Sequence, residues 1–299
     1  MSQLPSHGRY PYSAITTPIR ATWPGGKRLA VYLAVNLEHF RFDGGLGAAL
    51  VPSDAKEPDI LNYTWRDYGN RVGVWRMIDL FDALCLPASI LVNSSIYEYC
   101  PEVMAALRAR GDEVVGHGRT NSERQGILKE ADECALIHEV SATILQAEGK
   151  AAKGWLGPWI SESNVTPDLL QENGYTYCLD WCMDDRPVWL TTRQGRILSL
   201  PYPQELNDIP ALVVRRHTAS EFGDMIIDQF DEMLEQSASG SLVMGIALHP
   251  YIVGQPFRMK HLRRALQHIV ARRDDIWITT AGAIADEFVK MDSAAILQR

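Results

Sequence analysis

Short apolar runs alternate along the chain with longer stretches of helical periodicity. The short runs are rich in Val, Ile, Leu and Ala, and they are continuous, which is typical of strands that are buried on both faces. We expect these strands at residues 28–38, 87–93, 112–118, 152–158, 175–180, 196–202, 241–250 and 275–280.

Apolar positions spaced three and four residues apart predict helices between these strands. The expected helices cover residues 72–84, 101–110, 129–148, 166–173, 220–235, 259–273 and 281–291. Two segments, 41–68 and 189–210, are poor in either pattern, and we expect loops there. Because strands and helices alternate without an internal linker, the pattern predicts a parallel α/β barrel in one domain, 26–299, preceded by an N-terminal arm, 1–25.

Polar side chains close most of the predicted strands. In a parallel barrel the carboxyl ends of all strands surround one mouth, where functional residues gather. We therefore expect the strand-closing residues to converge there, with the two loops at the rim. These residues are Glu38, His39, Asn93, His117, Trp155, Asp180 and His249.

Composition narrows the class of protein. The 299 residues are 46% hydrophobic and 22% charged, as in an ordinary globular enzyme, and the net charge of -8 argues against a nucleic-acid partner. No apolar run approaches the roughly 20 residues that span a bilayer. The N-terminal 18 residues lack the pattern of a secretory signal, and five irregularly spaced cysteines indicate reduced thiols, so we expect a cytoplasmic protein without a membrane partner.

Ionisable residues at two strand ends are the first chemical candidates. Glu38 and His39 follow a strand of apolar residues, so at least one of the two side chains faces the mouth, and neither belongs in a dry core; a surface ion pair of Glu38 is the alternative. His249 ends another strand and precedes Pro250, which cannot continue a sheet interior. A neutral imidazole at that point, with its pKa near the working pH, suits proton donation to a leaving group.

The stretch "VVGHGRTN" raises the question of a metal. His117 is followed at i+4 by Asn121, which is the spacing of metal-binding histidine pairs on a helix, with asparagine in the second place. Two interpretations stay open: a metal held with a carboxamide ligand, or a pocket without a metal. An N-capping arrangement for a following helix is a third.

Aromatic and charged residues near the strand ends are candidates for substrate binding. Trp155, Trp159 and Trp181 could hold a flat ring, although packing is their commoner role. Asp180 could orient a histidine or an arginine, but the carboxylate that orients His249 is left open. The candidate clamps for a substrate carbonyl or carboxylate are Arg66 and Arg71, for which structural salt bridges are an equal alternative.

The order of several segments resembles the polysaccharide deacetylase family, carbohydrate esterase family four. The segments are "RDYGNRVGVWR", "EVVGHG", "KGWLGPW", "DWCMDDRPVWL" and "LHPYIVGQPFR", and the resemblance spans about residues 26–290. It is strongest to the branch that contains the cofactor-independent allantoinase and cyclic imide hydrolases. The resemblance implies a distorted barrel of seven or eight β/α units.

Position by position, the resemblance implies a catalytic base at Glu38, a general acid at His249, and metal ligands at His39, His117 and Asn121. Two of those ligands depart from the family pattern, because His39 replaces an aspartate and Asn121 replaces a histidine. The family's arginine near "GWLGPW" has no clear counterpart. A neutral set with a carboxamide holds zinc poorly, so we expect either no cofactor or a weakly held divalent metal, zinc before others.

The leading hypothesis is a hydrolase that opens a small cyclic amide or imide at its carbon–nitrogen bond. A metal-dependent deacetylase of N-acetylated sugars, acting in carbohydrate metabolism, is the first alternative, and a non-catalytic barrel that binds a small ligand is the second. The expected partner is a small-molecule substrate. A homo-oligomer is also expected, because the arm 1–25 has no evident partner within the barrel.

Overall fold

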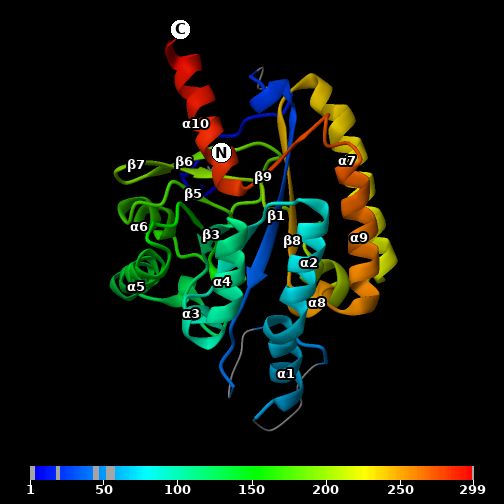
Figure 1. The fold of residues 1–299 in the computed structure, drawn as a ribbon. Helices are drawn as coiled ribbons and strands as arrows, with labels where there is room; N and C mark the ends of the chain where they lie inside the picture. The colour runs from blue at the N-terminus through cyan, green and yellow to red at the C-terminus, as the bar shows by residue number, and fades with distance from the viewer. Residues whose placement is uncertain (1–3, 18–20, 43–46, 52–57, 298–299) are drawn as a thin grey trace.

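One long strand, β1 (Leu29–Leu37), organises the sheet (Figure 1). The computed structural model describes residues 4–17, 21–42, 47–51 and 58–297. Its sheet has nine strands in the order β6-β7-β5-β4-β3-β2-β1-β8, with β9 also paired to β1. The other strands are β2 (Ser89–Val92), β3 (Glu113–Gly116), β4 (Gly154–Trp155), β5 (Tyr177–Cys178), β6 (Val188–Thr192), β7 (Gly195–Ser199), β8 (Leu242–Leu248) and β9 (Trp277–Thr279).

Helices cover the outer face of the curled sheet, with α7 and α9 beside β8 and with α3 to α6 beyond β2 to β5 (Figure 1). The helices are α1 (Ile60–Tyr68), α2 (Val74–Leu84), α3 (Ile96–Tyr99), α4 (Pro101–Arg110), α5 (Glu130–Glu148), α6 (Thr166–Glu172), α7 (Ala219–Gln236), α8 (Pro250–Val253), α9 (Pro256–Val270) and α10 (Ala281–Leu297). Every predicted helix corresponds to one of them, with shifts of a few residues at the ends.

The distorted α/β barrel predicted from the sequence is confirmed, but the sheet does not close. β6 and β8 stand at its two ends, and irregular chain lies between them. That chain still bonds to β8: the backbone N–H of Val243 donates to the carbonyl of Asp185 (2.9 Å), and that of Ala247 to the carbonyl of Leu206 (3.0 Å). The opening is therefore sealed by backbone hydrogen bonds instead of by a further strand.

Both segments predicted as long loops contain regular structure, although the strand expected at 196–202 is confirmed as β7. Segment 41–68 contains α1, whose first turn is capped by Asp59 accepting from the backbone of Asn62 (3.1 Å). Segment 189–210 contains most of the antiparallel hairpin β6–β7. Both elements are short, and neither carries the long periodic pattern on which the prediction rested.

Side chains of β1 alternate between two cores. Leu29, Val31, Leu33, Val35 and Leu37 pack outward under the helices. Ala30, Tyr32 and Ala34 pack inside the barrel. The same alternation in the other strands determines which strand-closing side chains reach the barrel interior, because successive side chains point to opposite faces.

The N-terminal arm docks on the molecule itself. The guanidinium of Arg9 donates two hydrogen bonds to the carboxylate of Asp168, each 2.7 Å long, and a third to the carbonyl of Thr191. His7 and Tyr10 contact the ring of Trp181. The premise behind the predicted oligomer, an arm without a partner in the barrel, is wrong, and the oligomer stays a prediction without that support.

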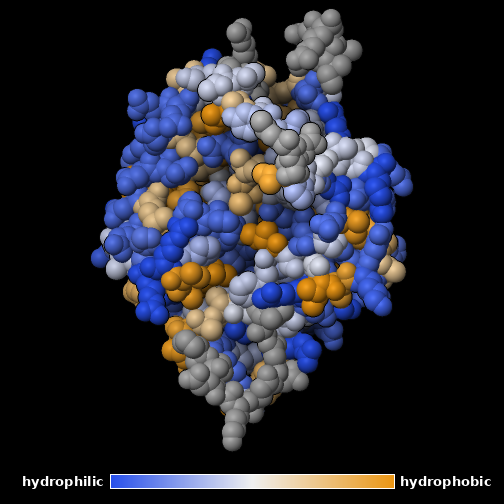
Figure 2. All heavy atoms as spheres, turned by 180° about the vertical axis from the view of Figure 1, so that it is seen from behind, coloured by the Kyte–Doolittle hydropathy of each residue, from blue (hydrophilic) through white to orange (hydrophobic). Residues whose placement is uncertain are grey.

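The exterior is a mosaic of polar and apolar side chains. Apolar groups reach the face opposite to that of Figure 1 as separate patches among polar ones (Figure 2). Among the described helices, none combines the length and hydrophobicity that crossing a lipid bilayer demands.

Loss of the arm's anchor should destabilise the fold. In Arg9→Ala the carboxylate of Asp168, which is 4% exposed, loses its guanidinium and keeps only the backbone N–H of Arg193. We expect the free energy of unfolding to fall by about 3 kcal/mol, as for other broken buried ion pairs. Denaturant titration measures this loss. The control is Arg215→Ala, which breaks an exposed pair with Glu205 and should leave the free energy of unfolding nearly unchanged. Equal losses in both variants would contradict the anchor.

Candidate functional site

A cavity of about 220 Å³ opens at the carboxyl ends of the strands. One wall is apolar and the opposite side is polar. The apolar lining comes from Leu156, Trp159, Ile160, Ile209, Pro210 and Val214, and the polar lining from Asn36, Glu38, His117, Asn121, Tyr202, Gln204, Asn207, His249 and Tyr251. A wider cavity of about 550 Å³ lies under the N-terminal arm, but it contains no histidine and no Glu38, so the chemistry points to the smaller one.

Glu38 lies at the centre of the polar side. Its side chain is 4% exposed, and its Oε1 accepts a hydrogen bond from Nδ2 of Asn121. The Nε2 atoms of His117 and His249 lie 3.6 and 3.5 Å from that same oxygen. The second oxygen, Oε2, is buried without a hydrogen-bond partner. A buried carboxylate with one unsatisfied oxygen is poised to bind a proton donor such as water.

His249 is held by a carboxylate that the sequence did not identify. Nδ1 of His249 is 2.6 Å from Oδ1 of Asp208, and the backbone N–H of His249 donates to Oδ2 of the same carboxylate (2.7 Å). Asp208 is fully buried just before the π-helical turn at 209–214. It follows no strand and precedes a plain apolar sequence, so no local pattern in the sequence points to it.

Three buried ionisable groups interact at the site. Burial lowers the pKa of His249, but the negative charges of Asp208 and Glu38 outweigh burial and raise it to about 10. Burial likewise raises the pKa of Glu38, but the charge of His249, whose Nε2 lies 3.5 Å away, outweighs burial, and the pKa is lowered to about 2. The predicted neutral imidazole at His249 is therefore wrong, because two carboxylates flank the ring and keep it protonated at neutral pH.

His117 offers a lone pair to the cavity. Its Nδ1 lies 2.7 Å from the carbonyl oxygen of Leu156, which can only accept, so Nδ1 carries the proton of the neutral ring. Nε2 then faces Glu38 and is buried without a partner. Asn93, which closes β2, donates to the carbonyl of His117 and fixes the backbone there.

Tyr251 is a second residue that the sequence reasoning missed. Its hydroxyl lines the cavity, is buried and has no hydrogen-bond partner. Burial raises the pKa of Tyr251 well above its usual range, and the charge of Glu38 adds to this, so the hydroxyl stays a proton donor. The available signal was its position two residues after His249 in "HPY", at the start of α8.

His39 does not join the other predicted metal ligands. Because Glu38 points into the barrel, the next side chain points outward. The ring of His39 stacks on Tyr99 with centroids 4.1 Å apart, and its Nδ1 bonds to the hydroxyl of Ser95 at 2.9 Å. The expected metal set of His39, His117 and Asn121 is therefore corrected: the structure does not bring it together.

The donors that remain do not suit a divalent metal. The carboxamide oxygen of Asn121 accepts from Nδ2 of Asn93 (3.2 Å), and its amide group donates to Glu38, so the reverse orientation would set oxygen against oxygen. Of the three implied ligands only Nε2 of His117 is free to coordinate. Zinc takes three or four protein ligands, so this single free nitrogen of the implied set does not make a zinc site.

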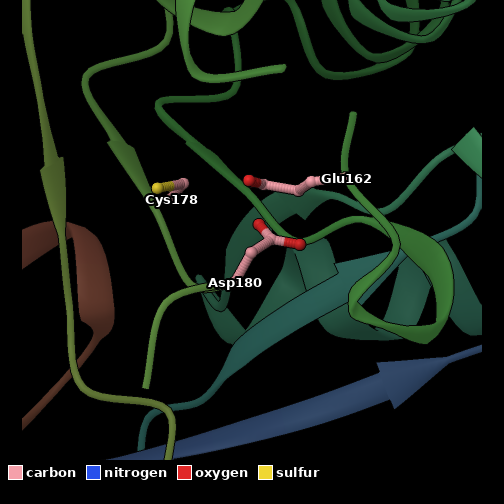
Figure 3. A group of neighbouring side chains, drawn as sticks. All are labelled: Glu162, Cys178 and Asp180. Atoms are coloured by element: carbon pink, nitrogen blue, oxygen red, sulfur yellow. The ribbon is translucent and has the colours of Figure 1, made fainter. Parts of the chain in front are cut away.

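Side-chain alternation also removes two other candidates from the cavity. Trp155 is fully buried in an outer core against Tyr175, since Leu156 takes the inward position. Asp180 likewise follows the outward Cys178, and it faces Glu162 and the backbone of Gly157 instead of His249 (Figure 3). Both residues close their strands as predicted, but their side chains lie on the outer face of the sheet and not on the face that lines the cavity.

Four further candidates for substrate binding lie in different places. Trp159 lines the cavity as expected, and its indole N–H approaches the carbonyl of Asn121 (3.4 Å). Trp181 instead donates to Glu162 and packs under the arm. Arg66 donates to the carbonyls of Gly47 and Ala48, and Arg71 is exposed on the π-helical turn. The two arginines and Trp181 therefore do not line the cavity.

The fold and this site together define a hydrolase-type α/β half-barrel with a carboxylate and an imidazolium at its mouth. A scan against protein-family models finds no match for the chain. The peptidoglycan deacetylase of Helicobacter pylori is 24% identical over 255 residues, which are 75% of this chain and 86% of that protein. A probable polysaccharide deacetylase of Pseudomonas aeruginosa PAO1 superposes with a TM-score of 0.79 at 26% identity, covering 90% of this chain and 93% of that one.

PuuE allantoinase has the same fold, with a TM-score of 0.77, 24% identity, and coverage of 88% of this chain and 91% of that one. These similarities support the resemblance of the chain to the polysaccharide deacetylase family. They indicate an enzyme, a hydrolase of amide carbon–nitrogen bonds.

Removing the charge of Asp208 should lower the pKa of His249. Asp208→Asn keeps a hydrogen-bond acceptor but takes away a full negative charge 2.6 Å from the ring. We expect the pKa of His249 to fall by about one to three pH units. Titration of the imidazole by NMR measures it. Asp231→Asn removes the exposed carboxylate bonded to His268 and should leave His249 unchanged; an unchanged His249 in Asp208→Asn as well would refute the assigned pairing.

Proposed function

We propose that the protein hydrolyses a small cyclic amide or imide and opens its ring at the carbon–nitrogen bond. One observation carries the proposal: a buried carboxylate, Glu38, and a buried imidazolium, His249, face the same small cavity in opposite proton states. A base and an acid held side by side are what amide hydrolysis requires, since water must lose a proton and the leaving nitrogen must gain one.

Glu38 and His117 are suited to hold the attacking water. Oε2 of Glu38 and Nε2 of His117 are both buried acceptors without partners. A water that donates one O–H to each turns its lone pair toward the substrate carbonyl. As oxygen bonds to the carbonyl carbon, Glu38 takes the water proton.

The negative charge that develops on the carbonyl oxygen needs a donor. The hydroxyl of Tyr251 is buried, protonated and unpaired at the cavity wall, and we assign it this role. His249 then gives its Nε2 proton to the ring nitrogen as the carbon–nitrogen bond breaks. Because Nε2 lies 3.5 Å from Glu38, the proton taken from water can return to His249 and restore both groups.

The cavity favours a small neutral ring. Its volume of about 220 Å³ lies below the roughly 300–1,000 Å³ of pockets that hold drug-sized ligands. Trp159 and Ile160 form a flat apolar wall, and no lysine or arginine appears among the described lining residues to pair with a substrate carboxylate. Strain in a small ring also lowers the need for a Lewis acid.

Deacetylation of an N-acetylated sugar is the second candidate function. It is favoured by the name of the Helicobacter pylori relative, a peptidoglycan deacetylase. The same acid and base would serve that reaction. Substrate size separates the two functions, because only the end of a sugar chain could enter a cavity of this volume.

Neutralising Glu38 should stop turnover. In Glu38→Gln the base is lost while the side chain keeps its shape, and we expect kcat to fall by about a thousandfold or more. The assay compares a hydantoin-like ring, a succinimide-like ring and an N-acetylated sugar. Cleavage of the sugar alone would favour the deacetylase, and unchanged turnover in Glu38→Gln would reject Glu38 as the base.

Glu139→Gln is the matched control for this substitution. Glu139 makes an exposed ion pair with Arg119 on the surface of α5 and does not line the cavity. Its substitution removes the same charge and should leave kcat within about twofold.

The pH profile should identify the base. The pKa of Glu38 is lowered to about 2, so the carboxylate stays charged and ready to accept a proton throughout the mildly acidic range. We therefore expect kcat/KM to hold steady as pH falls from neutrality to about 5, as long as the protein stays folded. A decline of kcat/KM within this range, in protein that stays folded, would contradict the assignment of Glu38 as the base.

A further inference from the structure

Two acidic side chains face each other behind the cavity without a cation. Figure 3 shows carboxyl oxygens of Glu162 and Asp180 directed toward one another beside Cys178. Each carboxyl has one oxygen bonded to an N–H: Gly157 donates to Asp180 and the indole of Trp181 to Glu162, both at 2.7 Å. The remaining oxygens, Glu162 Oε1 and Asp180 Oδ2, are buried and unpaired. No lysine, arginine or histidine among the described residues forms a salt bridge with either.

Two carboxylates that face each other in a buried site cannot both stay charged. Either a proton or a cation must lie between them. The arrangement suits one shared proton, because each carboxyl already has a donor for its outer oxygen and lacks one for its inner oxygen.

A single peptide unit connects Asp180 to the site. The carbonyl of Leu156 accepts from Nδ1 of His117, and the N–H of the same peptide, on Gly157, donates to Asp180, both at 2.7 Å. The unit is planar and rigid, so a charge that holds its N–H also orients its C=O. A side chain at position 157 would disturb this, since a Cβ there would lie 2.7 Å from the carbonyl oxygen of Ser161 and 3.0 Å from Asp180.

Asp180 and Glu162 also contact both ends of the turn that forms the cavity wall. Trp159 and Ile160 both adopt left-handed backbone conformations, with φ of 63° and 53°, which are strained in residues other than glycine and persist only where the surroundings hold them. The turn that contains them begins at Gly157 and ends at Glu162. Asp180 holds its first end through the Gly157 N–H and its second through the facing Glu162 carboxyl.

We propose that Asp180 and Glu162, joined by one shared proton, are positioning residues: through the Leu156–Gly157 peptide they fix the ring of His117, and through the turn they fix the wall formed by Trp159 and Ile160. The effect of the Asp180–Glu162 pair on turnover rests on the proposed hydrolytic function. The effect of the pair on the His117 ring is independent of that function.

The pair should lose its proton on the alkaline side. Burial raises the pKa of Asp180 to about 7 and that of Glu162 well above its usual range, to which the charge of Asp180 adds. Four other titratable groups act on the pair or are acted on by it. The charge of Glu133 on α5 further raises the pKa of Glu162, and burial raises the pKa of the Cys178 thiol on β5. The charge of Glu162 also acts on the guanidinium of Arg9 in the N-terminal arm, and that of Asp180 on the hydroxyl of Tyr202. At a pH below the pKa values of the pair the shared proton holds the two carboxyl groups together. At a higher pH the two carboxylates are both charged, repel each other and release the turn.

Nitrogen NMR of the His117 ring in the ligand-free protein tests the positioning directly. We expect the neutral ring of His117 to carry its proton on Nδ1 in the wild type while the pair shares its proton, and a mixture of ring forms once the pair ionises. In Glu162→Gln the side-chain amide replaces the shared proton as donor, so the neutral ring should keep its proton on Nδ1 over the whole alkaline range. In Asp180→Ala the mixture should appear already at a pH where the wild-type pair still shares its proton. The same ring form in all three proteins at every pH would overturn the proposal, whether or not any substrate is hydrolysed.

Kinetics supply the second test. We expect an alkaline loss of kcat/KM near the pKa of the pair in the wild type and in the surface variant Glu139→Gln, and none in Glu162→Gln. Asp180→Ala should lose about 10–100-fold at neutral pH, as do other carboxylates that orient a catalytic histidine. An alkaline loss that persists in Glu162→Gln would overturn the proposal. So would one equivalent of a divalent metal that is lost in Cys178→Ala, since a cation would then occupy the place of the proton.

Discussion

A charged carboxylate buried at the carboxyl end of β1 is the feature on which the rest of the site depends. Removing such a group from water costs several kcal/mol, so Glu38 is stable only because His249 carries a proton beside it. His249 in turn keeps that proton because Asp208 lies on its other side. These three buried charges keep the base ionised and the acid protonated at the same pH. The long apolar strand β1 positions the base at the cavity.

The sequence predicts the fold well, because continuous apolar runs and helical periodicity survive in nearly every strand and helix. It also predicts that Glu38, His117 and His249 close strands. His39, Trp155 and Asp180 also close strands, but their side chains lie on the outer face of the sheet. The positions of Glu38, His117 and His249 continue the inward side of the alternation. That side can be counted along the strands from inward residues such as Tyr32 or Leu91.

Other features lie beyond any local pattern. Asp208 reaches His249 only because the chain between β7 and α7 folds across the open side of the barrel. The pairing of Glu162 with Asp180 joins a turn after β4 to the end of β5, and each residue alone reads as an ordinary surface acid. The outward His39 and the occupied carboxamide of Asn121 explain why the metal set implied by the family resemblance does not assemble in this chain.

If the acid and base in the cavity open an amide ring without a bound ion, the reaction should survive removal of metal. The decisive experiment is metal analysis of the chelator-washed protein, with hydrolysis of hydantoin-like and succinimide-like rings followed on the same sample. We expect less than about a tenth of an equivalent of metal and undiminished turnover. Near-stoichiometric zinc whose removal abolishes activity and whose return restores it would instead show that hydrolysis depends on a metal.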